Sequence, residues 1–346
     1  MNRSIRTSLF VTVAAVGTLA LGAVTASAQD AASFYKGKTM TFITPGSPGG
    51  GYDTYMREMI PHLEKKLGAT IVPVNEPGGG HLLAVNKTYS AAPDGLTILL
   101  NDGEASLLGQ ILDVPAARYE LAKMNWIARV NGEKRLVLFT KSSPYNTIQE
   151  ASGGSKIIKF GTTGKTDATG LATTMASQAL NLKTSIVTGY KGSREFVRAA
   201  IQGEVNAISL SESSALRFSK GGRLKPATVL ARSRSELFPN VPTVYEVLKL
   251  SDEQAWYLDF HEAFAEIGRS IVTGPGVPAD RIALLRKVFD EVLQDKAFVA
   301  YMAKKKRPIL YANAAALEKA AKQVLGSLSP EKKKDIKEIV LNKFYK

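Results

Sequence analysis

Hydrophobic positions in the first half of the chain alternate between short β-rich runs and stretches with helical spacing. The first run, 40–43, ends at a turn rich in glycine and proline, 45–51, and apolar residues then recur every three or four positions. This spacing is typical of a helix that packs one face against a sheet. A strand–helix–strand order predicts a parallel sheet. The expected strands are 40–43, 70–74 and 97–100, and the expected helices are 56–67 and 82–89.

The second half repeats the order of strands and helices. The expected strands are 157–160, 184–187, 205–210 and 227–231, and the expected helices are 168–181, 194–202, 279–293 and 315–325. Two similar halves joined near 130–145 predict two lobes of α/β type with mostly parallel sheets, a hinge and a central cleft. We expect lobe 1 to comprise 29–135, with the C-terminal helices 275–346 packing back on it, and lobe 2 to comprise 136–274.

The N-terminal segment has the pattern of a secretory signal peptide. Arg3 and Arg6 precede an apolar run of about 16 residues, shorter than the roughly 20 that a spanning helix needs. Ala26-Ser27-Ala28 follows as a small-residue cleavage site. We expect cleavage after Ala28 and export to the periplasm. The absence of Cys excludes disulfides and thiolate metal sites, which is compatible with a bacterial periplasm.

The formal net charge of +14 raises the question of a nucleic-acid partner. The densest basic run is Lys304-Lys305-Lys306-Arg307, and a second, 332–334, lies near the C-terminus. Runs of this kind are mostly solvated faces, and we expect that here. No zinc-finger, RRM or helix-turn-helix pattern accompanies them. We therefore expect no nucleic-acid partner, and infer mild steering of anions toward the surface.

Two turns, one in each half, are built alike. Each joins a strand to a helix N-terminus and is rich in glycine and small hydroxyl residues: 45–51 and 161–167. A helix N-terminus offers unpaired N–H groups and partial positive charge, and glycine lets a ligand approach the backbone. In open α/β sheets ligands gather at the carboxyl ends of strands, where both turns lie. The pattern indicates an anion site, although glycine turns also serve simply as connections.

These residues resemble the receptors of tripartite tricarboxylate transporters, also called Bug proteins, over the whole mature chain. Pro48-Gly49-Gly50-Gly51-Tyr52-Asp53 is similar to the Pro-Pro-Gly-Gly-x-x-Asp turn of that family. The further matches, in order, are 75–80 (NEPGGG), 91–97 (AAPDGLT), 190–192 (YKG), 238–243 (FPNVPT) and 275–278 (PGVP). The resemblance implies a two-lobed Venus-flytrap fold. It also implies a periplasmic receptor, not an enzyme, that delivers a small organic carboxylate to inner-membrane permease subunits. We expect a monomer without a cofactor or metal.

The resemblance also implies that the carboxylate is held by the two turns. The positions that it assigns are Gly50, Gly51, Tyr52, Asp53, Thr162, Thr163, Gly164, Lys165, Thr166 and Tyr190. Asp53 is either a ligand contact or a helix cap, and capping is the commoner role for Asp at such a place. Lys165 either meets the carboxylate or is solvated.

The chain departs from the family pattern at several positions. In that family the second turn is usually followed by a His at the position where this chain has Gly170. This chain also carries Asp167 within the turn. Arg269 stands where an aromatic residue is usual; it either grips a carboxylate through its planar guanidinium or forms a surface salt bridge. Glu104 adds a negative charge near the expected cleft. Glu104 and Asp167 favour a ligand with an amine or protonated group, unless both point away.

Enzyme motifs are incomplete. The segment 161–166 resembles a phosphate loop, but the required first glycine is replaced by Lys159. No G-x-S-x-G elbow is present, and the three His residues lack metal-ligand spacing. His81 follows a glycine turn and is the one that would face the cleft. Two alternatives remain open: an exported α/β hydrolytic enzyme using acids such as Asp53 and Glu104, or a ligand sensor that signals to a membrane kinase.

Overall fold

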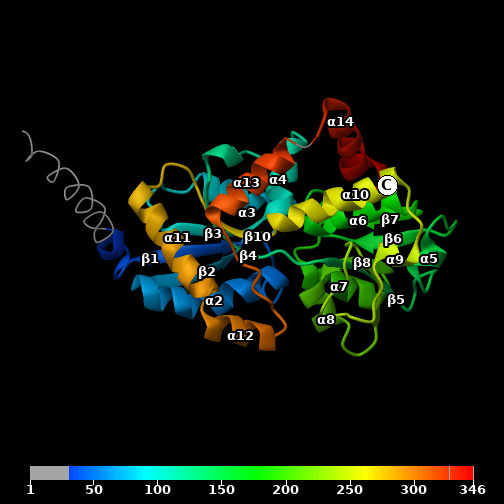
Figure 1. Cartoon of the computed structure of the whole chain (residues 1–346), viewed down its shortest axis with the longest axis horizontal. Coiled ribbons are helices and arrows are strands. Elements are labelled where there is room, and N and C mark those ends of the chain that lie inside the picture. The colour runs from blue at the N-terminus through cyan, green and yellow to red at the C-terminus, as the bar shows by residue number, and fades with distance from the viewer. Residues whose placement is uncertain (1–30, 327, 346) are drawn as a thin grey trace, which may run out of the picture.

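The computed structural model describes residues 31–326 and 328–345, so the expected signal peptide lies outside the described residues. The strands of the described residues form two sheets, each the centre of one lobe (Figure 1). This confirms the expected two-lobed α/β architecture. Within the described ranges, every helix falls short of the length or apolar character that a membrane crossing needs.

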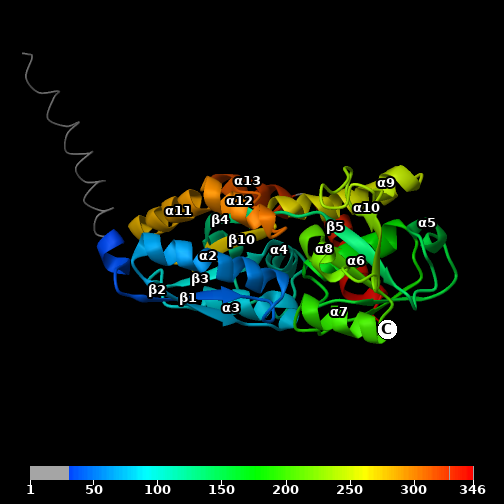
Figure 2. The same ribbon diagram turned by 90° about the horizontal axis from the view of Figure 1, so that it is seen from below.

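The first sheet has the strand order β11-β4-β10-β3-β1-β2. Its helices lie on both faces, with α2 and α11 crossing one of them (Figures 1 and 2). The strands are β1 (Thr39–Thr44), β2 (Thr70–Asn75), β3 (Thr97–Asp102), β4 (Asn125–Asn131), β10 (Arg269–Thr273) and β11 (Ala312–Asn313). The helices are α2 (Gly51–Leu67), α3 (Leu82–Tyr89), α4 (Gly103–Ile111), α11 (Ala279–Leu293), α12 (Lys296–Lys304) and α13 (Ala314–Leu325), with 3-10 turns at Gly79–His81 and Leu121–Lys123.

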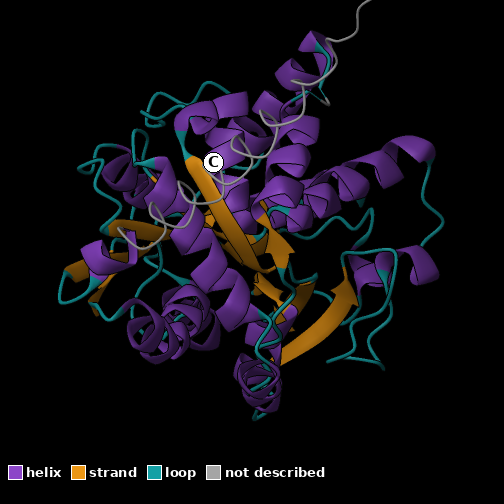
Figure 3. Ribbon diagram, turned by 60° about the vertical axis from the view of Figure 1, so that its left-hand side comes forward, coloured by secondary structure: helices purple, strands orange, loops and turns teal. Residues whose placement is uncertain are grey.

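The second sheet has the strand order β7-β6-β8-β5-β9. Its strands are β5 (Arg135–Thr140), β6 (Ile158–Gly161), β7 (Thr184–Val187), β8 (Ala207–Ser211) and β9 (Leu224–Val229). The helices of this lobe are α5 (Ile148–Ala151), α6 (Ala168–Ala179), α7 (Ser193–Gln202), α8 (Glu212–Phe218) and α9 (Val244–Val247). Helix α10 (Asp252–Ala263) packs on α6 and leads through a 3-10 turn, Phe264–Glu266, back to the first lobe. Figure 3 shows strands enclosed by helices in both lobes.

The sheets are mixed, which corrects the expectation of mostly parallel pairing. Parallel pairing joins β1 to β2 and β3, and β6 to β7 and β8, where the strand–helix–strand order was recognised. Strands β10, β4 and β11 pair antiparallel in the first sheet, and β5 pairs antiparallel with β8 and β9 in the second. For β5 and for β10 the preceding strand along the chain, β4 and β9 respectively, lies in the other sheet, so neither follows a strand of its own sheet through a crossover helix that would set a parallel direction.

Two segments lie in a different lobe from the one expected. Strand β10 falls within 136–274, yet it is inserted between β3 and β4 of the first sheet, where all five of its residues are buried. Helix α14 (Pro330–Glu338) and the π-helical turn Ile339–Lys343 fall within 275–346, yet the turn packs against α6 of the second lobe and α14 packs against the turn. Their few apolar residues, among them Ile336 and Val340, are buried there. Each segment is placed by the apolar surface that it covers rather than by its place in the sequence.

The core has three parts. One cluster of buried side chains is continuous across both lobes and includes residues of α4, α6, α10 and α13. A second cluster belongs to the first lobe and contains the inner faces of α2 and α11. A third belongs to the second lobe, around α7 and α8. The lobes are therefore packed together through the first cluster, whereas the other two clusters are separate and leave room for a site between them.

Candidate functional site

A cavity, partly open to solvent, lies where the two lobes meet. Both lobes contribute to its wall, and most of the contributing segments are helix N-termini or strand ends. The lining residues are Gly46, Ser47, Gly50, Gly51, Tyr52, His81, Asp102 and Arg269 from the first lobe, and Arg135, Thr163, Ala168, Thr169, Gly192, Ser193, Phe196, Leu210, Ser211 and Ser214 from the second.

The N-terminus of α2 opens directly onto this cavity. Its N-cap is Gly50, a residue without a side chain, so the first N–H groups of the helix are left to other acceptors. At Gly51 a Cβ atom would lie 3.1 Å from Ser214 Oγ and 3.5 Å from Arg269 Nη2. Glycine at this position therefore keeps the backbone accessible between the two lobes. Of the first turn's predicted residues, Gly50, Gly51 and Tyr52 all line the cavity.

Asp53 is engaged in the structure of the turn itself. Its Oδ2 accepts the Gly49 N–H at 2.9 Å, and its Oδ1 accepts Arg57 Nε at 2.9 Å and Asn75 Nδ2 at 3.0 Å. The carboxylate thus ties the turn to α2 and to the end of β2. These bonds give Asp53 a structural role within the turn, although the N–H that it accepts precedes the helix, and the first N–H groups of α2 stay uncapped.

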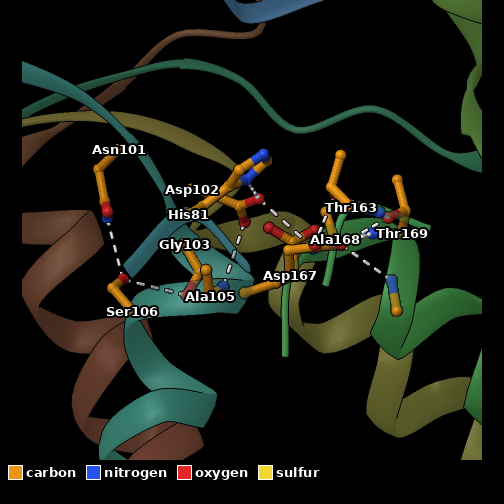
Figure 4. A network of polar contacts seen from close by, with 12 residues as sticks. His81, Asn101, Asp102, Gly103, Ala105, Ser106, Thr163, Asp167, Ala168 and Thr169 are labelled. Carbon is orange, nitrogen blue, oxygen red and sulfur yellow. Dashed lines mark hydrogen bonds and ion pairs between the residues drawn. The ribbon is translucent and has the colours of Figure 1, made fainter. Parts of the chain in front are cut away.

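The N-terminus of α6, expected to be the second anion site, is already occupied by carboxylates of the chain. Asp167 caps the helix, and its Oδ1 accepts the N–H groups of Thr169 at 2.7 Å and Gly170 at 2.9 Å (Figure 4). Its Oδ2 accepts the hydroxyl of Thr163 at 2.5 Å. The remaining Ala168 N–H points to Asp102 of the other lobe, 3.4 Å away. Thr163 lines the cavity, but its hydroxyl donates its proton to Asp167.

The other predicted residues of the second lobe lie outside the cavity. Gly164, Lys165, Thr166 and Tyr190 line a separate hollow between the lobes, beside the C-terminal segment. Lys165 Nζ donates to the Leu341 carbonyl at 2.6 Å and lies 4.5 Å from the centre of the Tyr345 ring.

The side chains of Tyr190 and Thr162 form hydrogen bonds within the second lobe. Tyr190 donates its hydroxyl proton to Glu204 at 2.5 Å. Thr162 is buried and donates to the Gly164 carbonyl at 3.0 Å.

Helix α7 supplies the anion-binding feature that the second turn lacks. Its N-cap is Gly192, again without a side chain, and Gly192, Ser193 and Phe196 line the cavity. In the sequence, Tyr190-Lys191-Gly192 stands out only as one of the motifs of the family resemblance. The usable signal was a glycine directly before a strongly amphipathic helix, which leaves the helix N-terminus uncapped.

Arg269, at the start of β10, is buried in the cavity wall rather than on the surface. Its Nη1 donates to Asn131 at 2.8 Å and to Glu133 at 2.6 Å, and its Nη2 donates to Ser211 at 3.2 Å. Burial by itself would lower the pKa of Arg269, but the charge of Glu133 outweighs it and raises that pKa. The guanidinium is permanently charged, and its position links the two lobes.

Arg135, the first residue of β5, is a site residue that sequence reasoning missed. Its side chain is only about 9% exposed, and its Nη2 lies 4.0 Å from Glu104 Oε1. Among the described residues its Nε has no hydrogen-bond partner. A buried guanidinium with a free donor at the wall of a cavity is suited to an anionic ligand. The only signal in the sequence was a charged residue opening an otherwise apolar strand.

Glu104 lies next to the cavity, in a small hollow that it shares with Asn131 and Glu133. Burial, followed by the nearby charge of Asp102, raises the pKa of Glu104 to about 8. Both effects favour the protonated, uncharged form of this carboxyl over the negative charge expected from the sequence.

The basic run at 304–307 is not a uniformly solvated face. Its three lysines are exposed, but Arg307 is buried, and its Nη1 donates to Ser213 of the second lobe at 2.7 Å. Lys306 has a left-handed φ of 57°, and this turns the chain so that Arg307 points inward. The expectation of a solvated run is therefore wrong for its last residue.

His81 and Asp102 form a buried pair at the junction of the lobes. His81 Nδ1 lies 2.6 Å from Asp102 Oδ2. Burial would lower the pKa of His81, but the hydrogen bond and charge of Asp102 outweigh it, so the pKa is raised above its usual 6.5. Burial would likewise raise the pKa of Asp102, yet His81 holds it well below its usual range. The histidine singled out in the sequence thus does line the cavity.

The two lobes touch directly around the cavity. The Ser47 N–H donates to the Lys191 carbonyl at 3.1 Å, and Arg217 Nη1 donates to the Gly49 carbonyl at 2.8 Å. A Cβ atom on Gly164 would lie 2.3 Å from Gly80 Cα, so backbone meets backbone there. These contacts define a closed arrangement of the lobes.

A family model and a similar curated protein both relate this chain to one receptor family. The model of the tripartite tricarboxylate transporter family receptor matches residues 55–324. Protein BugT of Bordetella pertussis is 26% identical over 289 residues, covering 82% of this chain and 85% of that protein.

Solved structures with the same fold belong to periplasmic binding proteins. The periplasmic binding protein BugD superimposes with a TM-score of 0.72 at 22% identity, covering 88% of this chain and 98% of BugD. MatC of Rhodopseudomonas palustris, solved with bound malate, gives a TM-score of 0.67 at 20% identity, covering 88% of this chain and 99% of MatC. The expected periplasmic-binding-protein fold is confirmed.

Proposed function

Because this chain belongs to the receptor family of tripartite tricarboxylate transporters, we propose that it captures a small organic carboxylate in the cavity between its lobes. One observation carries this proposal. The uncapped N-termini of α2 and α7 and the buried guanidinium groups of Arg135 and Arg269 all line the same cavity. Each of these features stabilises negative charge.

The arrangement favours backbone recognition of one carboxylate. The N–H groups at the start of α2 and α7 come from opposite lobes, so a carboxylate between them is bonded by both lobes at once. Such a ligand stabilises the closed arrangement because it binds the closed form better than an open one. Tyr52, Phe196 and Leu210 supply apolar surface for a short carbon chain.

The ligand class is a compact organic acid with one or two carboxylates. MatC, which has a related fold, was solved with bound malate, an acid of four carbon atoms. Arg135 and Arg269 offer cationic partners beyond the helix N-termini, which suits a second acidic group. The family consists of receptors, which leaves the hydrolytic alternative without support.

We further infer that the protein acts in the periplasm and delivers its ligand to inner-membrane permease subunits, as a monomer. The family assignment and the signal-peptide pattern at 1–28 support this inference. Gene neighbourhood and co-purification with permease subunits would separate delivery from signalling to a membrane kinase.

The test is ligand binding by the mature chain, 29–346. Thermal shift and calorimetry with malate, succinate, adipate, citrate and benzoate, and with succinamide as the uncharged control, identify the ligand. We expect at least one acid to raise the melting temperature by mass action, with no effect of succinamide. In Arg135→Met that affinity falls about tenfold or more, whereas the matched change Arg232→Met, at an exposed arginine, leaves it unchanged. A folded protein that binds none of the acids contradicts the proposal.

A further inference from the structure

His81 presents an unused polar atom to the cavity. The residue is 6% exposed, it lines the cavity wall, and within residues 31–326 and 328–345 its Nε2 has no hydrogen-bond partner. Its φ of 75° lies in the left-handed region, which costs free energy for a residue other than glycine. A buried polar atom without a partner, on a backbone held in an unfavourable conformation, indicates a functional role.

Asp102 fixes the orientation of the His81 ring. Its Oδ2 lies 2.6 Å from His81 Nδ1, and its Oδ1 accepts the Ala105 N–H at 3.2 Å (Figure 4). Asp102 is fully buried at the end of β3 and caps α4, so its position is set by the first lobe. Because Nδ1 donates to Asp102, Nε2 is the atom left for the cavity. When the ring is protonated, Nε2 is a charged donor.

The surrounding charges favour the protonated ring. Asp102 provides the main interaction, and Asp167, which caps α6 in the second lobe, adds negative charge. Arg135 of β5 opposes them, and the ring of Tyr52 on α2 packs edge-on with its centre 5.5 Å away. Glu104 of α4 is close to Asp102 and is the other titratable group of this cluster. Burial would lower the pKa of His81, but the hydrogen bond and charge of Asp102 outweigh it, so the pKa is raised and the charged donor is favoured.

We propose that His81, positioned by Asp102, is a specificity-determining residue that binds the ligand as an imidazolium, donating its Nε2–H to an anionic oxygen. The inference rests on the proposed function, because it assigns a partner to the carboxylate ligand of that same cavity. It predicts a ligand with an acidic group at the His81 end of the cavity, and it makes capture dependent on pH.

The sign of the pH dependence follows from the charged donor. Affinity is full below the pKa of His81 in the free protein, and it falls as the pH rises above that pKa. For one linked proton the limiting loss is about tenfold for each pH unit. Ionisation of Glu104 acts in the same direction, because it adds a negative charge near the ligand, so the two groups must be separated by variants.

The experiment measures affinity by calorimetry from pH 6 to pH 9 with the tightest-binding dicarboxylate of the panel, whose carboxyl groups stay ionised over this range. Four proteins are compared: the unaltered mature chain, His81→Asn, Glu104→Gln and His62→Gln. Asparagine tolerates the left-handed φ at position 81, so the variant should fold. His62, an exposed histidine on α2, is the matched control.

We expect the affinity of the unaltered protein and of His62→Gln to fall with rising pH. In His81→Asn the affinity should be about tenfold to a hundredfold lower at pH 6, and only the part of the pH dependence that is linked to Glu104 should remain. Glu104→Gln should keep the His81-linked part of the dependence. NMR of the imidazole should show the pKa of His81 rising when ligand binds.

Two results would overturn the inference while leaving the proposed function intact. One is carboxylate binding that is equally strong and equally pH-dependent in His81→Asn and in the unaltered protein. The other is a pH dependence that disappears in Glu104→Gln and persists in His81→Asn. By contrast, a folded protein that binds no acid at any pH contradicts the proposed function itself.

Discussion

At the scale of single residues, the cavity wall depends on buried charges that compensate one another. Arg269 lies beside Glu133, with 2.6 Å between Nη1 and Oε2, and both side chains are almost fully shielded from water. The Arg269 guanidinium also lies 4.9 Å from the centre of the Tyr52 ring and 5.2 Å from that of Tyr55. Taking two charges out of water is costly, and only their close contact and additional hydrogen bonds offset the cost.

Removing one member of this pair should therefore destabilise the protein strongly. In Arg269→Met the carboxylate of Glu133 stays buried without its hydrogen-bonded cation, and we expect a loss of about 3–5 kcal/mol in the free energy of unfolding. Urea denaturation followed by circular dichroism measures it. Arg232→Met, which breaks an exposed pair with Asp259, should change the stability little. Similar losses in both variants would mean that Arg269 contributes no more than a surface charge.

The residue scale also shows where the sequence was informative about the site. Glycines before helices led to Gly50 and Gly51, because an uncapped helix N-terminus has a local signature. Arg135 and Arg307 were not found, since nothing local distinguishes a buried arginine from a solvated one. Their burial depends on which strand or turn brings them to the other lobe, and long-range packing decides that.

At the scale of elements, helix α6 differs from α2 and α7 in carrying its own anion. Asp167 accepts two backbone N–H groups of the helix and the hydroxyls of Thr163 and Thr169. The cap fixes the turn that precedes the helix, and Gly170 is packed against that turn, because a Cβ there would lie 2.3 Å from the Gly164 carbonyl oxygen. The second turn is thus a rigid structural element, whereas α2 and α7 keep free N-termini for a ligand.

Loss of this cap should lower the stability of the protein. For Asp167→Ala we expect a decrease of about 1–2 kcal/mol in the free energy of unfolding, because the side-chain acceptor of the Thr169 and Gly170 N–H groups is lost. Asp167→Asn keeps an acceptor at the N-cap and should lose clearly less. The midpoints of urea denaturation compare the two. An alanine variant as stable as the asparagine variant would show that the cap is unimportant for α6.

The elements found from sequence are those whose partners are close along the chain. Strands β1, β2 and β3 and helices α2 and α3 follow one another and were predicted with nearly correct bounds, except that α2 begins at Gly51 rather than at residue 56. Strands β4 and β10 were missed. They pair across an interval of more than one hundred residues, and their antiparallel direction depends on how the chain passes between lobes. Hydrophobic periodicity carries no information about such distant pairing.

At the scale of the whole molecule, the segments that pass between the lobes are tightly packed. The link at 132–134 runs beside the turn that precedes β10, where a Cβ on Gly132 would lie 2.0 Å from the Ala265 carbonyl oxygen. A Cβ on Gly268 would lie 2.3 Å from the Asn131 carbonyl oxygen. Backbone contacts of this kind leave little freedom within each segment. Opening of the cavity must therefore come from small rotations about these segments, as in hinge motion.

Closure itself can be tested at Gly192, which faces the first lobe across the cavity. A Cβ there would lie 2.5 Å from Ser47 Oγ and 3.1 Å from Ser47 N. The backbone of Gly192 is extended, with φ of 163°, so alanine is tolerated within its own lobe. Gly192→Ala should consequently leave the fold intact and disfavour the closed arrangement. If closure costs about 1.4 kcal/mol more, apparent ligand affinity falls about tenfold, because fewer molecules are competent to bind.

The measurement combines calorimetry of the carboxylate with small-angle scattering of the ligand-free protein. We expect Gly192→Ala to bind more weakly and to have a larger radius of gyration than the unaltered chain, at nearly the same stability in urea. Adding Ser47→Gly removes the side chain that the new methyl group meets, so the double variant should recover part of the affinity, although the contact with the Ser47 backbone remains. If Gly192→Ala binds as tightly as the unaltered protein, the lobes have room to adjust and direct contact at Ser47 does not limit closure. If it binds weakly and Ser47→Gly gives no recovery, the loss comes from the α7 N-terminus itself rather than from the meeting of the lobes.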